Sequence, residues 1–397
     1  MSASSKLPPF DPADPLGVDD LLDAEDLAIR DTVRTWAADR VLPYVAEWYE
    51  KGELPGIREL ARELGGIGAL GMSLEGYGCA GASAVQYGLA CLELEAADSG
   101  IRSLVSVQGS LAMYAVHRFG SEEQKQRWLP SMASGDVIGC FGLTEPDHGS
   151  DPGAMRTFAK RGAGGDWILN GRKMWITNGS VAGVAVVWAQ TDDGIRGFVV
   201  PTDAPGFSAP EIKHKWSLRA SVTSELILDD VRLPADAVLP GVRGLKGPLS
   251  CLSHARYGIV WGAMGAARAS FEAAVSYAKT REQFGRPIGG FQLTQAKLAD
   301  MAVELHKGIL LAHHLGRRMD AGRLRPEQVS FGKLNNVREA IEICRTARTI
   351  LGANGISLEY PVMRHATNLE SVLTYEGTVE MHQLVLGKAL TGLDAFR

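Results

Sequence analysis

Apolar residues recur at helical spacing in the first third of the chain. Ile29, Val33 and Trp36 follow one another at three- and four-residue intervals with charged residues between them, which is typical of an amphipathic helix over 26–42. The same kind of pattern predicts further helices at 56–70, 83–99, 103–119 and 121–134. We therefore expect a helical N-terminal domain over residues 17–136, preceded by a polar, proline-containing flexible arm at 1–16.

Short apolar runs separated by glycine, proline and aspartate replace this pattern after residue 136. Runs at 137–143, 184–188, 197–201 and 224–228 predict strands. The sharpest local signal is Asn170-Gly171 between two apolar runs at 167–169 and 172–177, because Asn-Gly is typical of a type I′ hairpin turn. We expect a compact β domain over residues 137–240 with a hairpin turn at 170–171.

Long helical periods return in the last third. They cover 263–281, 292–321 and 326–351, and a final helical run ends the chain, so residues 241–397 predict an antiparallel bundle. The order is helices, strands, helices, without the βαβ alternation of a Rossmann sheet. Gly66, Gly68 and Gly71 match a dinucleotide-binding fingerprint by letter, but they follow a helical segment, which predicts a helix end and a turn.

Composition excludes several classes of function. The 397 residues carry a formal net charge of −5 with basic residues spread along the chain, so nucleic acid is not an expected partner. The five cysteines have no paired spacing, which predicts no zinc or redox motif and a reduced, intracellular location. No run approaches the roughly 18 apolar residues of a membrane span, and the N-terminus lacks the order of a signal peptide. The adjacent His313 and His314 point about 100° apart on a helix, so we expect no metal site.

Two segments carry candidate chemistry at and beside a carboxylate. Glu376 stands next to Gly377, an arrangement that suits a general base facing a bound ligand, although a glutamate capping the final helix has the same pattern. The loop at 141–151 offers the hydroxyls of Thr144 and Ser150 among glycines that let backbone approach a ligand, but an ordinary polar turn reads equally well.

Two further segments suit a large cofactor. Trp175 beside Thr177 combines an aromatic plane with a hydroxyl, as a heteroaromatic ligand requires, while a buried core tryptophan is the plainer alternative. Arg281 and Arg286 follow a predicted helix and could hold a diphosphate, or they could be helix-terminal cations favoured by the helix dipole.

Five motifs occur in a fixed order: FGLTEPDHGSD at 141–151, WITN at 175–178, REQFG at 281–285, LGANG at 351–355 and YEGT at 375–378. Together they resemble the acyl-CoA dehydrogenase family of flavoproteins over residues 21–396. The resemblance implies an α+β fold with an N-terminal helical domain, a middle β-barrel domain and a C-terminal four-helix bundle. It also implies a homotetramer with one FAD per subunit and an acyl-CoA substrate. Some residues around each FAD would come from a neighbouring subunit.

The resemblance assigns roles to residues by position. It makes Glu376 the base that removes the substrate α-proton, and Ala255 occupies the alternative base position that some relatives use. Around the acyl-CoA it places Glu95, Arg102, Ser103, Ser150, Leu249, Arg256, Tyr375 and Gly377. Around FAD it places Phe141, Leu143, Thr144, Gly149, Ser150, Trp175, Ile176, Thr177, Arg281, Phe284, Gln292, Leu351, Gly352, Ala353, Thr378 and Phe396.

The acyl group follows from a narrower resemblance. Glu95, six intervening residues and Arg102-Ser103 are similar to the glutaryl-CoA dehydrogenase subfamily, in which this pattern holds the distal carboxylate of the substrate. Oxidation of glutaryl-CoA with decarboxylation to crotonyl-CoA and CO2 is then expected, with Glu95 modulating the charge of Arg102. The plain alternative is a surface salt bridge between Arg102 and Glu95 or Asp98.

Several positions depart from the glutaryl-CoA pattern. Ile101 replaces Tyr, Gly109 replaces Ser, Ala353 replaces Gly, and Val379-Glu380-Met381-His382 stands where His-Asp-Ile-His is usual. A short-chain acyl-CoA dehydrogenase, an oxidase on the same scaffold, and a flavin-binding protein without turnover therefore remain alternatives. Family likeness further implies electron-transfer flavoprotein as the acceptor. It also implies a cytoplasmic location in a bacterium or the mitochondrial matrix in a eukaryote.

Overall fold

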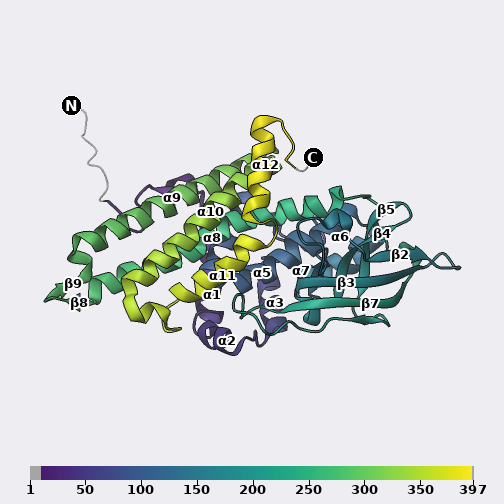
Figure 1. Cartoon of the computed structure of the whole chain (residues 1–397), viewed down its shortest axis with the longest axis horizontal. Helices are drawn as coiled ribbons and strands as arrows, with labels where there is room; N and C mark the ends of the chain where they lie inside the picture. Colours follow the sequence, from purple (N-terminus) through teal and green to yellow (C-terminus); the bar gives the residue numbers. More distant parts are fainter. Residues whose placement is uncertain (1–9, 396–397) are drawn as a thin grey trace.

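The structure is a computed structural model that describes residues 10–395. Figure 1 shows an elongated molecule with long helices at one end and a β-sheet at the other. The predicted arm at 1–16 lies partly outside the described residues, and Phe396 lies outside them as well. The fold is α+β, as the sequence predicts, with a mixed sheet between two helical regions.

The N-terminal helices lie close to their predicted positions. After a short 3-10 turn (η1, Val18–Leu21), they are α1 (Ala24–Arg40), α2 (Val45–Lys51), α3 (Ile57–Gly66), α4 (Ala84–Ala97), α5 (Ser99–Ser106), a π-helical segment (η2, Val107–Met113), α6 (Tyr114–Phe119) and α7 (Glu122–Ala133). Capping boxes at Ser83 and Ser121 fix the starts of α4 and α7. The sequence missed α2, and it placed the break between α4 and α5 several residues late. Asp98 makes that break, because its extended backbone ends α4 and its side chain caps α5.

Seven strands form one mixed sheet: β1 (Gly139–Gly142), β2 (Phe158–Arg161), β3 (Trp167–Thr177), β4 (Val184–Thr191), β5 (Gly194–Pro201), β6 (Phe207–Ser208) and β7 (Thr223–Leu233). Their order is β1-β4-β2-β3-β7-β6, with β5 also paired to β4. The expected closed barrel is not found, because no pairing among the described strands joins β6 back to β1. Short 3-10 turns at Pro152–Ala154, Gly179–Val181 and Ala235–Ala237 complete this region.

The predicted hairpin turn at Asn170-Gly171 is wrong. Strand β3 runs straight through both residues, and a bulge there shifts its register against β7. The Asn170 side chain exchanges two 2.9 Å hydrogen bonds with Asp230 on the neighbouring strand. A Cβ atom on Gly171 would lie 2.5 Å from the Thr157 hydroxyl, so close packing explains this glycine. The actual turn comes earlier, at 162–166, where Gly165 has φ +84°.

The C-terminal helices are longer and more divided than predicted. They are α8 (Lys246–Thr280), α9 (Gln292–Asp320), α10 (Pro326–Leu351), α11 (Val362–Thr374) and α12 (Val379–Thr391). A small hairpin, β8 (Glu282–Gln283) with β9 (Arg286–Pro287), and the turn η6 (Ile288–Gly290) join α8 to α9. The turn η7 (Gly352–Ile356) follows α10. The final run is two helices, and residues 375–378 form the break between them. Helices α8 to α11 pack as a bundle, and α12 rises from it (Figure 1).

Three apolar cores hold these layers together. The largest joins the N-terminal helices to the bundle through residues such as Leu94, Trp261 and Val337. Strand β4 is buried on both faces. Val184, Val186 and Trp188 belong to the core shared with the neighbouring helices, and Ala185, Val187 and Ala189 belong to the core on the other face of the sheet. No helix within residues 10–395 is long and apolar enough to span a membrane.

Candidate active site

The break between α11 and α12 holds the candidate base in an unusual backbone conformation. Glu376 has φ +53° and Gly377 has φ +105°, and a left-handed conformation is uncommon for a glutamate. Such strain costs about 1–3 kcal/mol and tends to occur at functional sites. Thr378 caps α12, with its hydroxyl accepting from Met381 N–H at 3.3 Å. Glu376 is therefore not the cap of the final helix, and its carboxylate is left for another role.

The Glu376 carboxylate lies in a buried group of cations. Its Oε2 atom is buried and has no hydrogen-bond partner in the described part of the chain. Burial raises the pKa of Glu376 above its ordinary value, and the charges of Arg102, Arg256 and Lys333 oppose that rise. Arg256 from α8 donates its Nε–H to the Glu376 carbonyl oxygen. A carboxylate with a raised pKa at the end of a strained turn has the properties of a general base.

Lys333 was not found by sequence reasoning. From α10 its Nζ donates to the carbonyl oxygens of Tyr375 and Gly377, each at 2.6 Å, on both sides of Glu376. The residue is 2% exposed. The sequence did contain a signal for a buried lysine, because Lys333 stands four residues from Val329 and four from Val337 on the apolar face of its helix. A lysine on an apolar face requires a partner.

Glu95 and Arg102 form a buried ion pair beside the same turn. Arg102 Nε donates to Glu95 Oε2 at 2.7 Å, and neither side chain is more than 1% exposed. Arg102 also donates to the Tyr375 hydroxyl, next to the base. The alternative of a surface salt bridge is therefore wrong, since burial of this pair is complete and Asp98 pairs with Arg364. Glu95 Oε1 is buried without a partner among the described residues.

Helix α8 makes room for this ion pair at a glycine. A Cβ atom on Gly262 would lie 2.0 Å from Glu95 Oε2 and 3.3 Å from Arg102 Nε. Real Cβ atoms do not approach other atoms so closely, so the pair needs glycine at this position. Sequence reasoning missed Gly262 as well, because nothing local distinguishes it from the other glycines of α8.

The structure brings together most of the predicted substrate residues. Glu95, Arg102, Arg256, Tyr375 and Gly377 all contribute to the buried group around Glu376 or contact a member of it. Ser103 is buried on α5, next to Arg102. Ser150 and Leu249 are exposed and lie outside the buried group, on the 141–151 loop and near the start of α8.

The 141–151 loop is fixed by a second buried ion pair. Glu145 accepts from Lys173 Nζ at 2.9 Å and from the backbone N–H groups of Arg156 and Thr157 at 2.6 and 2.9 Å. Although burial acts against it, these bonds lower the pKa of Glu145 to about 2. Lys173 also donates to the Leu143 carbonyl at 3.1 Å, and burial lowers the pKa of Lys173 to about 8. The loop is thus held in one conformation by these bonds and is not an ordinary polar turn.

Trp175 lies beside this loop with its ring exposed. The side chain is 57% exposed and the backbone has φ +62°, so Trp175 is not a buried core tryptophan. The preceding residue, Met174, donates its N–H to Thr144 O at 2.8 Å, which holds the strand against the loop. Phe141, Leu143 and Ile176 are buried beneath, and Thr177 is half-buried. Gly149 at the tip of the loop is exposed. An open aromatic face beside a fixed polar loop fits a flat heteroaromatic group.

The remaining predicted cofactor residues lie at the other end of the molecule. Arg281 follows α8, Phe284 lies in the β8–β9 hairpin and is 94% exposed, and Gln292 begins α9. Leu351 is buried, whereas Gly352 and Ala353 are exposed in the turn after α10. The β8–β9 hairpin lies at the end of the bundle farthest from β3 (Figure 1). Thr378 remains with the Glu376 turn. A single chain therefore does not bring the two groups of predicted cofactor residues together.

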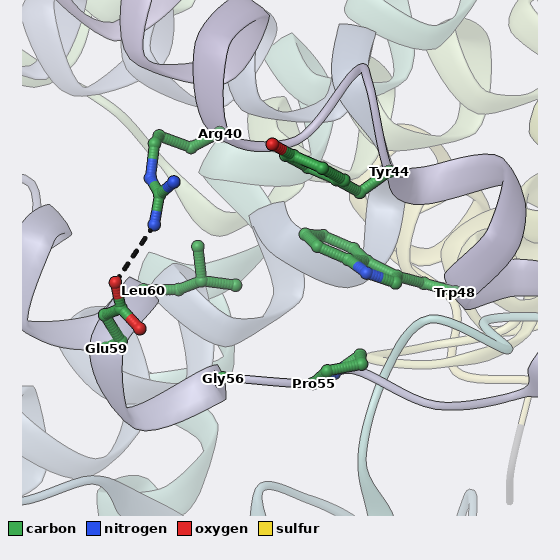
Figure 2. Close-up of a pocket in the computed structure, with 7 residues that line it drawn as sticks. All are labelled: Arg40, Tyr44, Trp48, Pro55, Gly56, Glu59 and Leu60. Carbon is green, nitrogen blue, oxygen red and sulfur yellow. Dashed lines mark hydrogen bonds and ion pairs between the residues drawn. The ribbon is translucent and has the colours of Figure 1, made fainter.

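A separate hollow of about 160 Å³ lies among α1, α2 and α3. Figure 2 shows the rings of Tyr44 and Trp48 stacked on one side, 5.8 Å apart, and Arg40 paired with Glu59 on the other. None of its lining residues belongs to the predicted site. We therefore place the active site at Glu376 and not here.

Comparison with known proteins agrees with this geometry. Three family models match the chain: the N-terminal, middle and C-terminal domains of acyl-CoA dehydrogenase, over residues 23–136, 140–231 and 242–391. A crystal structure of glutaryl-CoA dehydrogenase from Mycobacterium smegmatis is 72% identical with a TM-score of 0.95, covering 97% of this chain and 99% of that one. A glutaryl-CoA dehydrogenase from the same organism, in complex with FADH2, is 64% identical with a TM-score of 0.94, covering 96% and 98%.

A more distant relative carries a different specificity in its name. Human mitochondrial short-chain specific acyl-CoA dehydrogenase is 40% identical over 297 residues, which is 73% of this chain and 71% of the relative. The family resemblance read from the five sequence motifs is confirmed. The chain belongs to the acyl-CoA dehydrogenase family.

Proposed function

We propose that this protein oxidises glutaryl-CoA between its α and β carbons and decarboxylates the product to crotonyl-CoA and CO2. The observation that carries the proposal is the buried Arg102, which donates a hydrogen bond to Tyr375, the residue directly before the base. Arg102 is paired with Glu95 through its Nε, while its terminal nitrogen on the side of Tyr375 is placed where the distal carboxylate of glutaryl-CoA would bind. The two solved glutaryl-CoA dehydrogenases at 72% and 64% identity support the same substrate.

FAD is the cofactor that the residues around β3 fit. The exposed Trp175 face and the fixed 141–151 loop would hold the isoalloxazine ring, and the FADH2 complex of the 64% identical relative supports this assignment. When bound, FAD accepts the hydride from the substrate β-carbon. Arg281, Phe284, Gln292 and the turn after Leu351 would hold the diphosphate and adenosine of a FAD in a neighbouring subunit. The distance of these residues from β3 supports an assembly in which subunits share sites, and family likeness implies that this assembly is a homotetramer.

Glu376 removes the α-proton. An acyl-CoA α-proton is too weakly acidic for a carboxylate in water, so both the base and the enolate need help from the protein. Burial raises the pKa of Glu376, which strengthens it as a base. The Glu376 N–H donates no hydrogen bond within the described part of the chain, which leaves it free for the thioester oxygen. Gly377 lets the thioester approach this N–H without a side chain in the way.

Decarboxylation then follows from the position of Arg102. After oxidation, the bond between the γ-carbon and the distal carboxylate breaks, and its electron pair enters a dienolate that the thioester stabilises. CO2 leaves, and protonated Glu376 returns its proton to the γ-carbon to give crotonyl-CoA. Arg102 holds the carboxylate in place for this step, and Glu95 sets how much of the positive charge of Arg102 the substrate encounters.

The second candidate is a short-chain acyl-CoA dehydrogenase, which the 40% identical human relative favours. A neutral acyl chain has no use for Arg102, so we place this function second. An oxidase would keep the same site and differ only in its acceptor, and a flavin-binding protein without turnover would have no need of a strained Glu376 with a buried, unpaired Oε2 atom. We further propose electron-transfer flavoprotein as acceptor, and a cytoplasmic or mitochondrial-matrix location.

We propose that the chain divides into an N-terminal helical domain at 17–136, a middle β domain at 137–240 and a C-terminal helical domain at 241–397.

Anaerobic titration of the purified flavoprotein with glutaryl-CoA, and separately with butyryl-CoA, tests the proposal. Bleaching of the flavin and release of CO2 with glutaryl-CoA are expected, with much weaker bleaching by butyryl-CoA. Preference for butyryl-CoA without CO2 would overturn the substrate and leave the family intact. Glu376→Gln is the matched control, since it should keep FAD and lose bleaching by about 10³-fold or more.

A further inference from the structure

We propose that Lys333 is a positioning residue for the general base, which fixes the backbone on both sides of Glu376 and supplies the positive charge that favours its ionised form. The proposal rests on the role of Glu376 in the proposed function, and it holds whichever acyl group is oxidised. Lys333 belongs to α10, whereas the base lies in the break between α11 and α12. It therefore acts from outside the segment that carries the base.

The geometry explains how one side chain can hold the turn. The two acceptors, Tyr375 O and Gly377 O, belong to the residues directly before and after Glu376, and each is 2.6 Å from Lys333 Nζ. Both Glu376 and Gly377 have positive φ angles. Because a left-handed glutamate is unfavourable by itself, it persists only where its surroundings fix it. The two bonds from Lys333 provide that restraint.

The charge of Lys333 is not neutralised by another carboxylate. No ion pair within 4.0 Å is found for it within residues 10–395. The groups that face it are the Glu376 carboxylate, the Arg256 and Arg102 guanidinium groups, the Tyr375 ring at 5.9 Å and His382. Arg102 already pairs with Glu95, so its charge is partly cancelled. Of the three cations, Arg102 acts most strongly on Glu376 and Lys333 least, but Lys333 adds to its charge two bonds to the backbone on either side of the base.

The titration of the neighbouring groups is consistent with this role. Burial lowers the pKa of Lys333 to about 7, so its charge is present on the acidic side of neutrality. Burial lowers the pKa of His382 to about 3, which leaves that ring neutral over the same range. Burial also raises the pKa of Tyr375, so its phenol carries no charge there. The cations that act on Glu376 are then Lys333, Arg256 and Arg102.

Two substitutions separate the charge of Lys333 from its hydrogen bonds. Lys333→Gln keeps a side-chain donor for the two carbonyl oxygens but removes the charge, and Lys333→Arg keeps the charge. Lys307→Gln is the matched control, because Lys307 is exposed on α9 and pairs with Glu304. Each protein is first assayed for bound FAD and for melting temperature.

The decisive measurement is exchange of the substrate α-proton with D2O, followed by NMR between pH 5 and 8. An acyl-CoA with sulfur in place of the β-carbon is used, since it has no β-hydride to give and reports only proton removal. Lys333→Gln should move the midpoint of the pH profile upward by about one unit, because removal of a nearby cation raises the pKa of a carboxylic acid. Lys333→Arg should keep the wild-type midpoint with a lower rate, and Lys307→Gln should match the wild type.

An unchanged midpoint in Lys333→Gln would overturn the proposal. Loss of FAD or of the melting transition in Lys333→Gln, with both retained in Lys333→Arg, would also overturn it, because the role would then be structural. Glu376→Gln distinguishes failure of the proposed function from failure of this inference. If that variant still exchanges the α-proton, Glu376 is not the base; if it does not, only the role of Lys333 is at issue.

Discussion

Gly262→Ala tests whether the Glu95–Arg102 pair selects the substrate. The new methyl group would lie 2.0 Å from Glu95 Oε2, while ordinary contacts begin near 3.4 Å. The Glu95 carboxylate must therefore move by more than an ångström, or α8 must move away from α4. The present 2.7 Å bond between Arg102 Nε and Glu95 Oε2 has the length of a charge-assisted hydrogen bond, and it cannot survive a shift of that size.

The cost can be bounded from the burial of the pair. Breaking a buried ion pair typically costs about 3–5 kcal/mol, because it leaves an uncompensated charge. Alanine is a better helix former than glycine by about 1 kcal/mol, which offsets part of this cost. We expect Gly262→Ala to lower the free energy of unfolding by about 2–4 kcal/mol. Displacement of Arg102 should also weaken the binding of the distal carboxylate by about 1.4 kcal/mol or more, which corresponds to a tenfold rise in KM for glutaryl-CoA.

Steady-state assays with glutaryl-CoA and butyryl-CoA, together with thermal unfolding, measure both effects. KM for glutaryl-CoA should rise about tenfold or more, while kcat/KM for butyryl-CoA should change much less. Gly387→Ala is the matched control, because Gly387 is also helical but a Cβ atom there would have nothing within 4 Å. That variant should be as active and at least as stable as the wild type. Wild-type KM and melting temperature in Gly262→Ala would refute the reasoning.

Three further outcomes follow from the same structure. Arg102→Gln should raise KM for glutaryl-CoA while it spares a neutral acyl-CoA, and equal losses on both substrates would argue against a carboxylate-binding role. Lys173→Met should leave Glu145 buried without its cation, which costs about 3–5 kcal/mol and should release FAD on gel filtration. Because burial raises the pKa of Glu376, and only its ionised form can accept a proton, kcat/KM should rise with pH through a value above the ordinary pKa of glutamate. A flat profile across that range would contradict the assignment.

Helical periodicity predicted the helical layers well because one face of each helix packs on a shared core. Ile29, Val33 and Trp36 all lie in or against the largest apolar core, as their spacing indicates. Breaks between helices were harder to find. Asp98 ends one helix and begins the next without glycine or proline, and the Glu376 turn divides a run whose apolar pattern continues on both sides.

The β region shows where local signals fail. Asn170-Gly171 has the composition of a hairpin turn, but cross-strand pairing with Asp230 and close packing on Thr157 keep it within a strand. Differences in strand propensity between residues span only about 1 kcal/mol, so tertiary contacts can outweigh the unfavourable propensity of Asn and Gly for a strand. The open pairing of the sheet, in place of a closed barrel, likewise depends on contacts between strands that are distant in sequence.

The residues of the candidate site also fall into those that the sequence predicted and those that it did not. Glu376 and Trp175 could be predicted because they belong to motifs whose order is characteristic, and Arg102 could be predicted from its spacing to Glu95. Lys333 and Gly262 were missed. The apolar face of α10 marks Lys333 as unusual, but the roles of both residues depend on what other elements place against them: the carbonyl groups around Glu376 and the Glu95 carboxylate. A sequence therefore predicts the residues that would react with or bind the ligands more readily than the residues that position them.

A buried network links the helix of Arg102, the proposed substrate anchor, to the helix before Glu376, the proposed base. Asp98 caps α5, the helix that carries Arg102, by accepting from Gly100 N–H at 2.7 Å. The same carboxylate accepts from Arg364 and, at 3.0 Å, from Asn368, both on α11, which leads to Glu376. Asp98 therefore connects α5, which carries Arg102, to α11, which ends just before Glu376, through groups that are almost fully buried. Because this network fixes Arg102 relative to Glu376, we expect the site to bind best a substrate whose thioester and distal carboxylate are separated by one particular length of chain. This restraint, added to the charge of Arg102, would let the protein select among dicarboxylic acyl groups.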